Sequence, residues 1–280
     1  MIVGPHRRRA RTAQYGLLAL YLVFLASPIL WMLSMSFKGP REFFVLHPSL
    51  IPHDWTLQNY RDAFTQNDLV HSAWNSLKVA TLTALITSCI GLPAAYVLAR
   101  SKGLLSRLGL GWILLSQMFP LILVIVPLFL VLRQVHLTNT HTGLVLVYVV
   151  FVLPFILWML QSYVRGIPRD LEEAAMVDGA GRLTVLRTVI LPLLAPGIAV
   201  TTLFAFIQTW NEFFFALVLL QSPNLTTLPL RLAQFVGIEG VVRYGPLAAS
   251  SLLATLPSLL LFGVIQRWLA RGVLAGAVKG

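Results

Sequence analysis

The side chains most able to do chemistry gather in one stretch, PRDLEEAAMVDGAGRLTVLRTVILPLLAP, which runs from Pro168 to Pro196. Asp170, Glu172 and Glu173 lie in the first turns of a predicted helix, where carboxylates interact favourably with the helix dipole. The glycine that follows the next aspartate is a natural left-handed cap, which ends this helix and lets a second one begin. Acidic and small side chains on a short capped helix between apolar segments predict a docking surface.

A second polar cluster, Trp210-Asn211-Glu212-Phe213, lies within an apolar segment. An ionisable group inside a membrane is costly unless it is paired or faces a cavity, so the glutamate is a candidate functional residue. The alternative is a carboxylate that is hydrogen-bonded to neighbouring helices near the interface. Two glutamines also suit a pathway for hydroxyl-rich cargo, although a glutamine that only bonds another helix is the commoner case. The candidate pathway or gate residues are Gln117, Gln208, Trp210, Asn211 and Glu212.

Catalytic chemistry finds little support in the sequence. No Ser/His/Asp set and no pair of carboxylates lies at a plausible membrane depth. The six histidines are scattered and the single cysteine, Cys89, lies in an apolar run, so we expect no metal site and no disulfide. We find no Walker-type phosphate loop, so ATP and Mg²⁺ are expected on another chain. The sequence therefore predicts a chain without a cofactor of its own and without enzymatic activity.

Composition places the chain in a membrane. Of its 280 residues, 57% are hydrophobic and only 11% are charged, and the mean hydropathy is +0.79. A soluble domain of this length would have more charged residues on its surface. The first apolar run is long enough to span and is followed by no small-residue cleavage site, so we expect an uncleaved helix.

Hydropathy predicts six transmembrane helices. They lie at about residues 15–36, 75–98, 108–132, 142–163, 197–220 and 245–265. The third segment contains Pro120 and Pro127, which break backbone hydrogen bonds that a neighbouring helix or a cavity must replace. Residues 38–71 are the most polar segment and are expected outside, with one amphipathic helix near residues 57–64. Residues 1–14 form the expected cytoplasmic N-terminus.

The distribution of positive charge sets the orientation. Under this topology, the inner segments carry roughly twice as many Lys and Arg residues as the outer segments, which places both termini in the cytoplasm. The net charge of +11 is therefore a signal of topology, and we expect no nucleic-acid partner.

The charged stretch resembles a known motif. Glu173-Ala174-Ala175, Asp178-Gly179-Ala180 and Leu191-Pro192 look like the EAA loop of the membrane subunits of bacterial ABC importers. In that family the loop is the coupling helix, which sits in a cleft of a cytoplasmic ATPase subunit. One departure is Leu186, where the family often has an aromatic residue. Without the resemblance, the stretch is equally compatible with an interfacial pair of capped helices.

Three further segments resemble the MalG type of carbohydrate-uptake permeases. They are the external pattern SFKGPREFF, the WNEF cluster, and the GAVKG ending, whose residues Ala277, Val278, Lys279 and Gly280 would reach into the ATPase dimer. The resemblance implies a type I ABC importer permease fold over residues 15–280, with core spans at about 72–270 and a coupling loop at 166–192. Glu172, which precedes the EAA triplet, is included among the expected coupling residues.

The resemblance also implies a function and partners. It predicts the permease subunit of an ATP-driven carbohydrate importer in the bacterial or archaeal cytoplasmic membrane, working by alternating access. The expected partners are a second homologous permease, two copies of an ABC ATPase, an extracytoplasmic sugar-binding protein and membrane lipid. The alternatives are a glycerol-phosphate or polyamine importer, or an ion-coupled secondary transporter. The identity of the sugar, direct substrate contact by this subunit, insertion of loop 221–244 into the binding protein, and the role of Glu212 stay open.

Overall fold

Helices form the regular structure of the chain. The computed structural model describes residues 5–65, 68–101, 103–237 and 242–277, and apart from two isolated β-bridges their regular elements are all helical. Among these residues, five helices are long and apolar enough to cross a membrane: Ala13–Ser36, Leu69–Arg100, His141–Arg165, Arg182–Trp210 and Tyr244–Gln266. The predicted all-α polytopic membrane fold is confirmed. The cytoplasmic placement of both termini stays a prediction.

The first of two compact units comprises Met1–Leu69 and Leu232–Thr255. It contains α1 (Pro5–Ser36), η1 (Pro40–Phe44), α2 (Gln58–Thr65) and the first part of α12 (Tyr244–Ala277). The amphipathic helix that the sequence predicts near residues 57–64 is α2. Its buried Asn59 donates amide hydrogen bonds to the carbonyls of Ser36, at 3.0 Å, and Lys38, at 2.9 Å. These bonds fold the external segment onto the end of α1.

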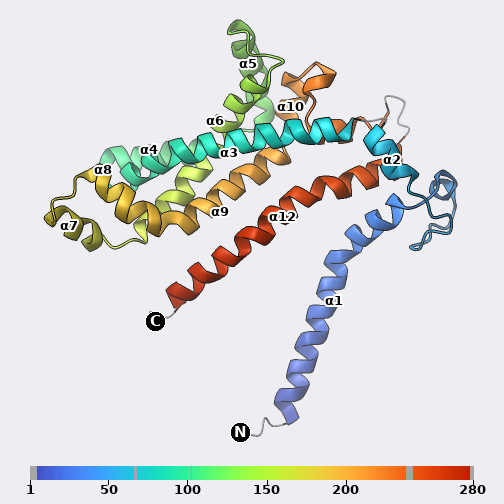
Figure 1. Ribbon diagram of the computed structural model, residues 1–280, viewed down its shortest axis with the longest axis horizontal. Helices are drawn as coiled ribbons and strands as arrows, with labels where there is room; N and C mark the ends of the chain where they lie inside the picture. Colours follow the sequence, from blue (N-terminus) through green and yellow to red (C-terminus); the bar gives the residue numbers. More distant parts are fainter. Residues whose placement is uncertain (1–4, 66–67, 102, 238–241, 278–280) are drawn as a thin grey trace. The chain divides into compact units, whose positions relative to one another are not determined.

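The second unit comprises Val70–Arg231 and Leu256–Gly280 and contains both polar clusters. Its elements are α3 (Leu69–Arg100), α4 (Leu104–Ser116), α5 (Leu121–Gln134), α6 (His141–Arg165), α7 (Asp170–Val177), α8 (Arg182–Val185), η2 (Leu186–Ile190), α9 (Leu191–Trp210), α10 (Phe214–Leu219), η3 (Pro223–Leu225), α11 (Leu228–Ala233) and the rest of α12. Helices α6 and α9 pack against each other. Within this unit, α7 lies at one end, and α5 and α10 lie near the other (Figure 1).

The third predicted span is interrupted. The sequence predicts one helix at residues 108–132, but the structure has α4 and α5 with residues 117–120 between them. Pro120 is the N-cap of α5, and because its ring restricts the residue before it and supplies no N–H, a helix does not continue through it. Pro127 is tolerated inside α5. The count of six spans therefore stays a prediction.

The fifth predicted span begins earlier than expected and is broken at its other end. Helix α8, the π-helical turn η2 and α9 follow one another directly, so that Arg182–Trp210 forms one candidate span of 29 residues. Pro192, which closely follows η2, has no N–H to donate, and a π turn is one way in which a helix accommodates such a defect. Residues 211–213 then separate α9 from α10, where the sequence predicts a helix that continues to about residue 220.

Two groups of buried apolar residues hold the second unit together. One lies where α3, α5, α6 and α10 meet and includes Val79, Leu144, Tyr148 and Phe215. The other lies beneath α7, and its buried residues are Ala99, Val164, Val185, Ile190 and Leu194. Because lipid tails are as apolar as these side chains, close packing contributes more to this core than transfer out of water.

Candidate functional site

The short helix α7 begins and ends as its sequence dictates. Its first turn contains Asp170, Glu172 and Glu173. It ends at Gly179, whose φ of +89° is the predicted left-handed cap. The Gly179 N–H donates to the carbonyl of Met176 at 3.0 Å, and the N–H of Ala180 donates to the carbonyl of Ala175, also at 3.0 Å. These two bonds form a Schellman motif, which satisfies the last carbonyls of α7.

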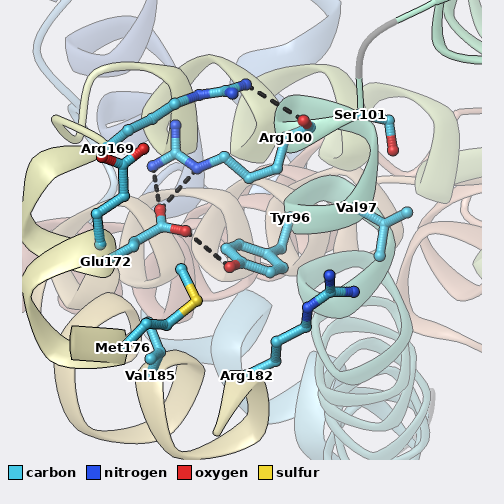
Figure 2. Close-up of a pocket in the computed structure, with 10 residues that line it drawn as sticks. Tyr96, Val97, Arg100, Ser101, Arg169, Glu172, Met176, Arg182 and Val185 are labelled. Carbon is cyan, nitrogen blue, oxygen red and sulfur yellow. Dashed lines mark hydrogen bonds and ion pairs between the residues drawn. The ribbon is translucent and has the colours of Figure 1, made fainter. Parts of the chain in front are cut away.

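Glu172 is the centre of the site. Its residue is only 5% exposed, and its carboxylate forms an ion pair with the Arg100 guanidinium, with an Nη2–Oε1 distance of 2.5 Å. The Nε of Arg100 donates to the same oxygen at 2.6 Å, and the Tyr96 hydroxyl donates to the other oxygen at 2.8 Å (Figure 2). Each carboxylate oxygen therefore has a donor from α3, so α7 is bonded to the end of a membrane span.

Further bonds tie the same region to the loop before α7. Arg100 also donates to the carbonyl of Ile167 at 3.0 Å, and Arg169 donates to the carbonyl of Arg100 at 3.2 Å. Beside them lies a cavity of about 410 Å³, whose lining also includes Met176 and Arg182 (Figure 2). A displacement of α7 must move the end of α3 with it or break these bonds.

The outer face of α7 is apolar and uncovered. Val177 is 87% exposed, and Leu171 and Ala174 are also exposed. Ala175, one of the residues of the EAA triplet, is turned inward and packs with Ala180 against the apolar group beneath α7. Glu173, Asp178 and Gly179 are exposed, and Leu191 and Pro192 begin α9.

Three of the five candidate pathway residues line one cavity. Gln208, Asn211 and Glu212 border a space of about 230 Å³ at the break between α9 and α10. Trp210 is only 3% exposed and stacks on Phe206, with ring centroids 5.7 Å apart, so it belongs to the core. Gln117 lies between α4 and α5, outside the residues that line this cavity, with its amide nitrogen 3.5 Å from the carbonyl of Phe151.

Glu212 caps the second half of the broken helix. Its carboxylate accepts from the backbone N–H of Phe215 at 3.0 Å and from that of Ala216 at 3.4 Å. The Tyr148 hydroxyl on α6 donates to the same carboxylate at 2.6 Å. This carboxylate, which the sequence places in the fifth predicted span, is thus satisfied by neutral donors, which is the structural alternative that the sequence left open.

Sequence reasoning missed the partners of both carboxylates. In the sequence, Arg100 is only one of the positive charges of the inner segments, and nothing in the local pattern marks Tyr96 or Tyr148 as a donor. The one available signal was an arginine and a tyrosine four residues apart, and hence on one helix face, at the end of an apolar run. Of the predicted C-terminal tail, Ala277 ends α12, and residues 278–280 lie outside the described residues.

Known proteins resemble this chain along most of its length. The chain is 55% identical to a putative ABC transporter permease of Streptomyces antibioticus, over 82% of this chain and 100% of the relative. It is 36% identical to the trehalose/maltose transport system permease protein MalG of Thermococcus litoralis, over 90% of this chain and 91% of that protein. It is 37% identical to the trehalose transport system permease protein SugB of Mycobacterium tuberculosis, over 97% of this chain and 99% of that protein.

The fold matches a solved transporter. A chain of a bacterial ABC transporter that imports the acidic polysaccharide alginate superposes with a TM-score of 0.78 at 23% identity, covering 95% of this chain and 99% of that one. Residues 88–275 match the family described as binding-protein-dependent transport system inner membrane component. The chain therefore belongs to this family and is a multi-pass permease subunit of an ABC transport system.

Proposed function

We propose that the chain is the permease subunit of an ATP-driven importer of a carbohydrate and that it forms half of the translocation pathway. Support for this cargo comes from relatives that are named for trehalose and maltose transport and cover nearly the whole chain. The residues of the cavity at the α9–α10 break also favour it. Anionic cargo such as a glycerol phosphodiester favours arginines, and a polyamine favours several carboxylates. The lining contains no Lys or Arg, and its one carboxylate is Glu212.

The observation that carries the coupling role is the construction of α7. Its outer face is apolar and exposed, whereas its inner face is fixed to α3 through the buried Glu172 and Arg100. A docking helix needs both properties, because a partner must find an open surface and its movement must reach the membrane spans. In this proposal α7 docks on a separate cytoplasmic ATPase, which binds ATP and Mg²⁺. This chain binds no nucleotide, carries no cofactor and breaks no bond.

The other partners follow from the same architecture. The most apolar 18-residue window of the candidate span in α1 contains no buried residue, which favours a second, homologous permease as its cover. A family of binding-protein-dependent transporters also needs an extracytoplasmic sugar-binding protein. In the proposed complex, Val278, Lys279 and Gly280 reach the interface of two ATPase copies. ATP-driven closure of that interface moves α7, and the spans open outward to receive the sugar.

Reconstitution tests this function. The chain is purified with its second permease and two ATPase copies, placed in lipid nanodiscs, and assayed for ATP hydrolysis with its binding protein in loaded and unloaded form. Trehalose, maltose, a glycerol phosphodiester and spermidine are compared as loads. We expect a disaccharide to stimulate hydrolysis above the unloaded level. Stimulation by the phosphodiester or spermidine alone refutes the carbohydrate cargo, and uptake by the chain alone on an ion gradient refutes the coupling role.

A further inference from the structure

The break between α9 and α10 lies at membrane depth. Tyr148 and Phe151 border it and lie seven and ten residues into α6, or about 10 and 15 Å from its first turn. The hydrocarbon core is about 30 Å thick, so the cavity extends from the outer third towards the midplane. Backbone that is not helical is tolerated at this depth only where it is buried in protein or lines a water-filled cavity. Residues 211–213 line the cavity of about 230 Å³.

Glu212 holds the rim of this cavity in place, but its carboxylate has little hydrogen-bonding capacity left for a ligand. One of its carboxylate oxygens accepts the backbone N–H of Phe215, and the other accepts the hydroxyl of Tyr148 and the backbone N–H of Ala216. The charge is therefore held by donors from α6 and α10. This arrangement fixes the rim of the cavity and leaves its interior without an unpaired charge.

Two amide side chains keep unused hydrogen-bonding groups at the same rim. Gln208 and Asn211 are both exposed and lie three residues apart, which places them on one face of α9. The Asn211 amide nitrogen donates to the carbonyl of Ile207 at 2.8 Å, which leaves its amide oxygen open. Gln208 makes no hydrogen bond to any described residue. The rings of Phe151 and Phe214, both partly exposed, complete the lining.

We propose that this cavity is a subsite for one neutral sugar ring of the cargo, a proposal that rests on the carbohydrate function above. Hydroxyl groups hydrogen-bond to the amides of Gln208 and Asn211, and the apolar face of the ring packs on an aromatic side chain. The volume of about 230 Å³ is below the roughly 300–1,000 Å³ of sites for drug-sized ligands, so it admits one ring and not an oligosaccharide. This subunit thus contacts the sugar directly.

Retention of sugar by the arrested complex tests the subsite. The complete transporter is trapped with vanadate in the presence of binding protein loaded with radiolabelled trehalose or maltose, and the sugar that stays bound is counted. We expect Gln208→Leu and Asn211→Leu each to lower retention about 3- to 10-fold, because each removes one hydrogen-bonding partner. Gln134→Leu, the same change on α5 outside the cavity, leaves retention unchanged. Equal retention in all three variants overturns the subsite.

Stimulated ATP hydrolysis separates this proposal from the function on which it rests. If neither disaccharide stimulates the parent complex, the carbohydrate function fails. If hydrolysis is stimulated in parent and variants alike but retention is unaffected, only the subsite fails. Co-purification of each leucine variant with the second permease and the ATPase shows that it folds and assembles.

Accessibility of the cavity gives a second, independent measurement. In a Cys89→Ser background, Asn211→Cys is exposed to a charged methanethiosulfonate reagent in the outward-open complex. We expect labelling, and we expect the disaccharide-loaded binding protein to slow it. Absence of labelling means that a side chain of the second permease fills the cavity, which overturns the proposal.

Discussion

Glu172 and Glu212 are two carboxylates with similar partners and different surroundings. Each accepts a hydrogen bond from a tyrosine hydroxyl on another helix, at 2.8 Å from Tyr96 and at 2.6 Å from Tyr148. Glu172, on α7, also pairs with the full positive charge of Arg100 at the end of α3. Glu212, at the break between α9 and α10, has backbone N–H groups in place of a cation.

The different surroundings suit the two carboxylates to different roles: one connects two helices, and the other holds a turn in place. Glu172 and Arg100 are 72 residues apart in the sequence, so their ion pair ties α7 to the end of α3. Glu212 mainly organises the three residues that precede α10, and its tyrosine fixes this turn against α6. An ion pair is strong where both partners are shielded from water, whereas neutral donors satisfy a carboxylate at membrane depth without a second buried charge.

Removal of the cation is expected to have the largest effect. Arg100→Leu leaves the buried Glu172 without a counter-charge, which costs about 3–5 kcal/mol in comparable pairs. We expect the thermal unfolding temperature of the complex to fall and stimulated ATP hydrolysis to be lost. The matched change Glu173→Gln, on an exposed carboxylate of the same turn, leaves the unfolding temperature unchanged.

A double variant sharpens the same comparison. Replacing both partners, Arg100→Met with Glu172→Leu, removes the buried charges together and is expected to restore most of the stability. Stimulated hydrolysis is expected to stay low, because an apolar pair does not fix the orientation of α7. Full recovery of stimulation in the double variant would show that the ion pair serves stability alone.

The carboxylate at the helix break is expected to contribute less. Glu212→Leu removes the acceptor of two backbone N–H groups and of one hydroxyl, a loss of about 2–3 kcal/mol. Tyr148→Phe removes one hydrogen bond and costs about 1–2 kcal/mol. Both are measured as unfolding temperatures of the complex, with Tyr163→Phe as the control. A larger loss from Tyr148→Phe than from Glu212→Leu would refute the assignment of the carboxylate as the cap of α10.

Much of the fold is predictable because the signals are local. Apolar runs of sufficient length define the spans, and the acidic first turn and Gly179 define both ends of α7. The interruptions are harder to predict. Pro120 ends one predicted span, whereas Pro127, Pro192 and Pro196 lie within helices, and the outcome depends on how the neighbouring structure replaces each missing hydrogen bond.

The interior of the site is not predictable from local pattern. The EAA residues are recognisable by their spacing, but the burial of Glu172 depends on Arg100 and Tyr96, more than seventy residues earlier. Trp210 belongs to the same polar tetrapeptide as its neighbours, yet it points into the core, because adjacent residues face different sides of a helix. The sequence predicts the segment in which such a residue lies, whereas the orientation of its side chain depends on packing.

A substitution of Gly179, the residue that caps α7, is expected to perturb the proposed coupling helix less. Gly179→Val forces a β-branched residue into left-handed backbone, at a cost of about 1–2 kcal/mol, although the position itself is open. We expect assembly to persist and sugar uptake to be lost, because the end of α7 no longer holds its docking face in place. Gly181→Val, at an equally open position with φ of −69°, is the control. Equal uptake by both variants would contradict a role for the cap.

Glu42 provides a third carboxylate, at the exposed surface of the external segment. Backbone N–H groups of Asp54 and His53 hydrogen-bond to it and lower its pKa below the ordinary value of 4.5. Since Glu42 has the lower pKa in the folded form, the contribution of its carboxylate to stability is present above about pH 4.5 and is lost as the pH falls through the folded pKa.

We expect pepsin to cleave the segment around residues 42–54 faster as the pH is lowered from 4.5. Glu42→Gln should be cleaved at a rate that changes less with pH, after correction for the activity of pepsin. The effect is expected to be the smallest of the series, because water competes for an exposed carboxylate. A pH dependence as steep in Glu42→Gln as in the parent would assign the acid sensitivity to another group and remove this carboxylate from the comparison.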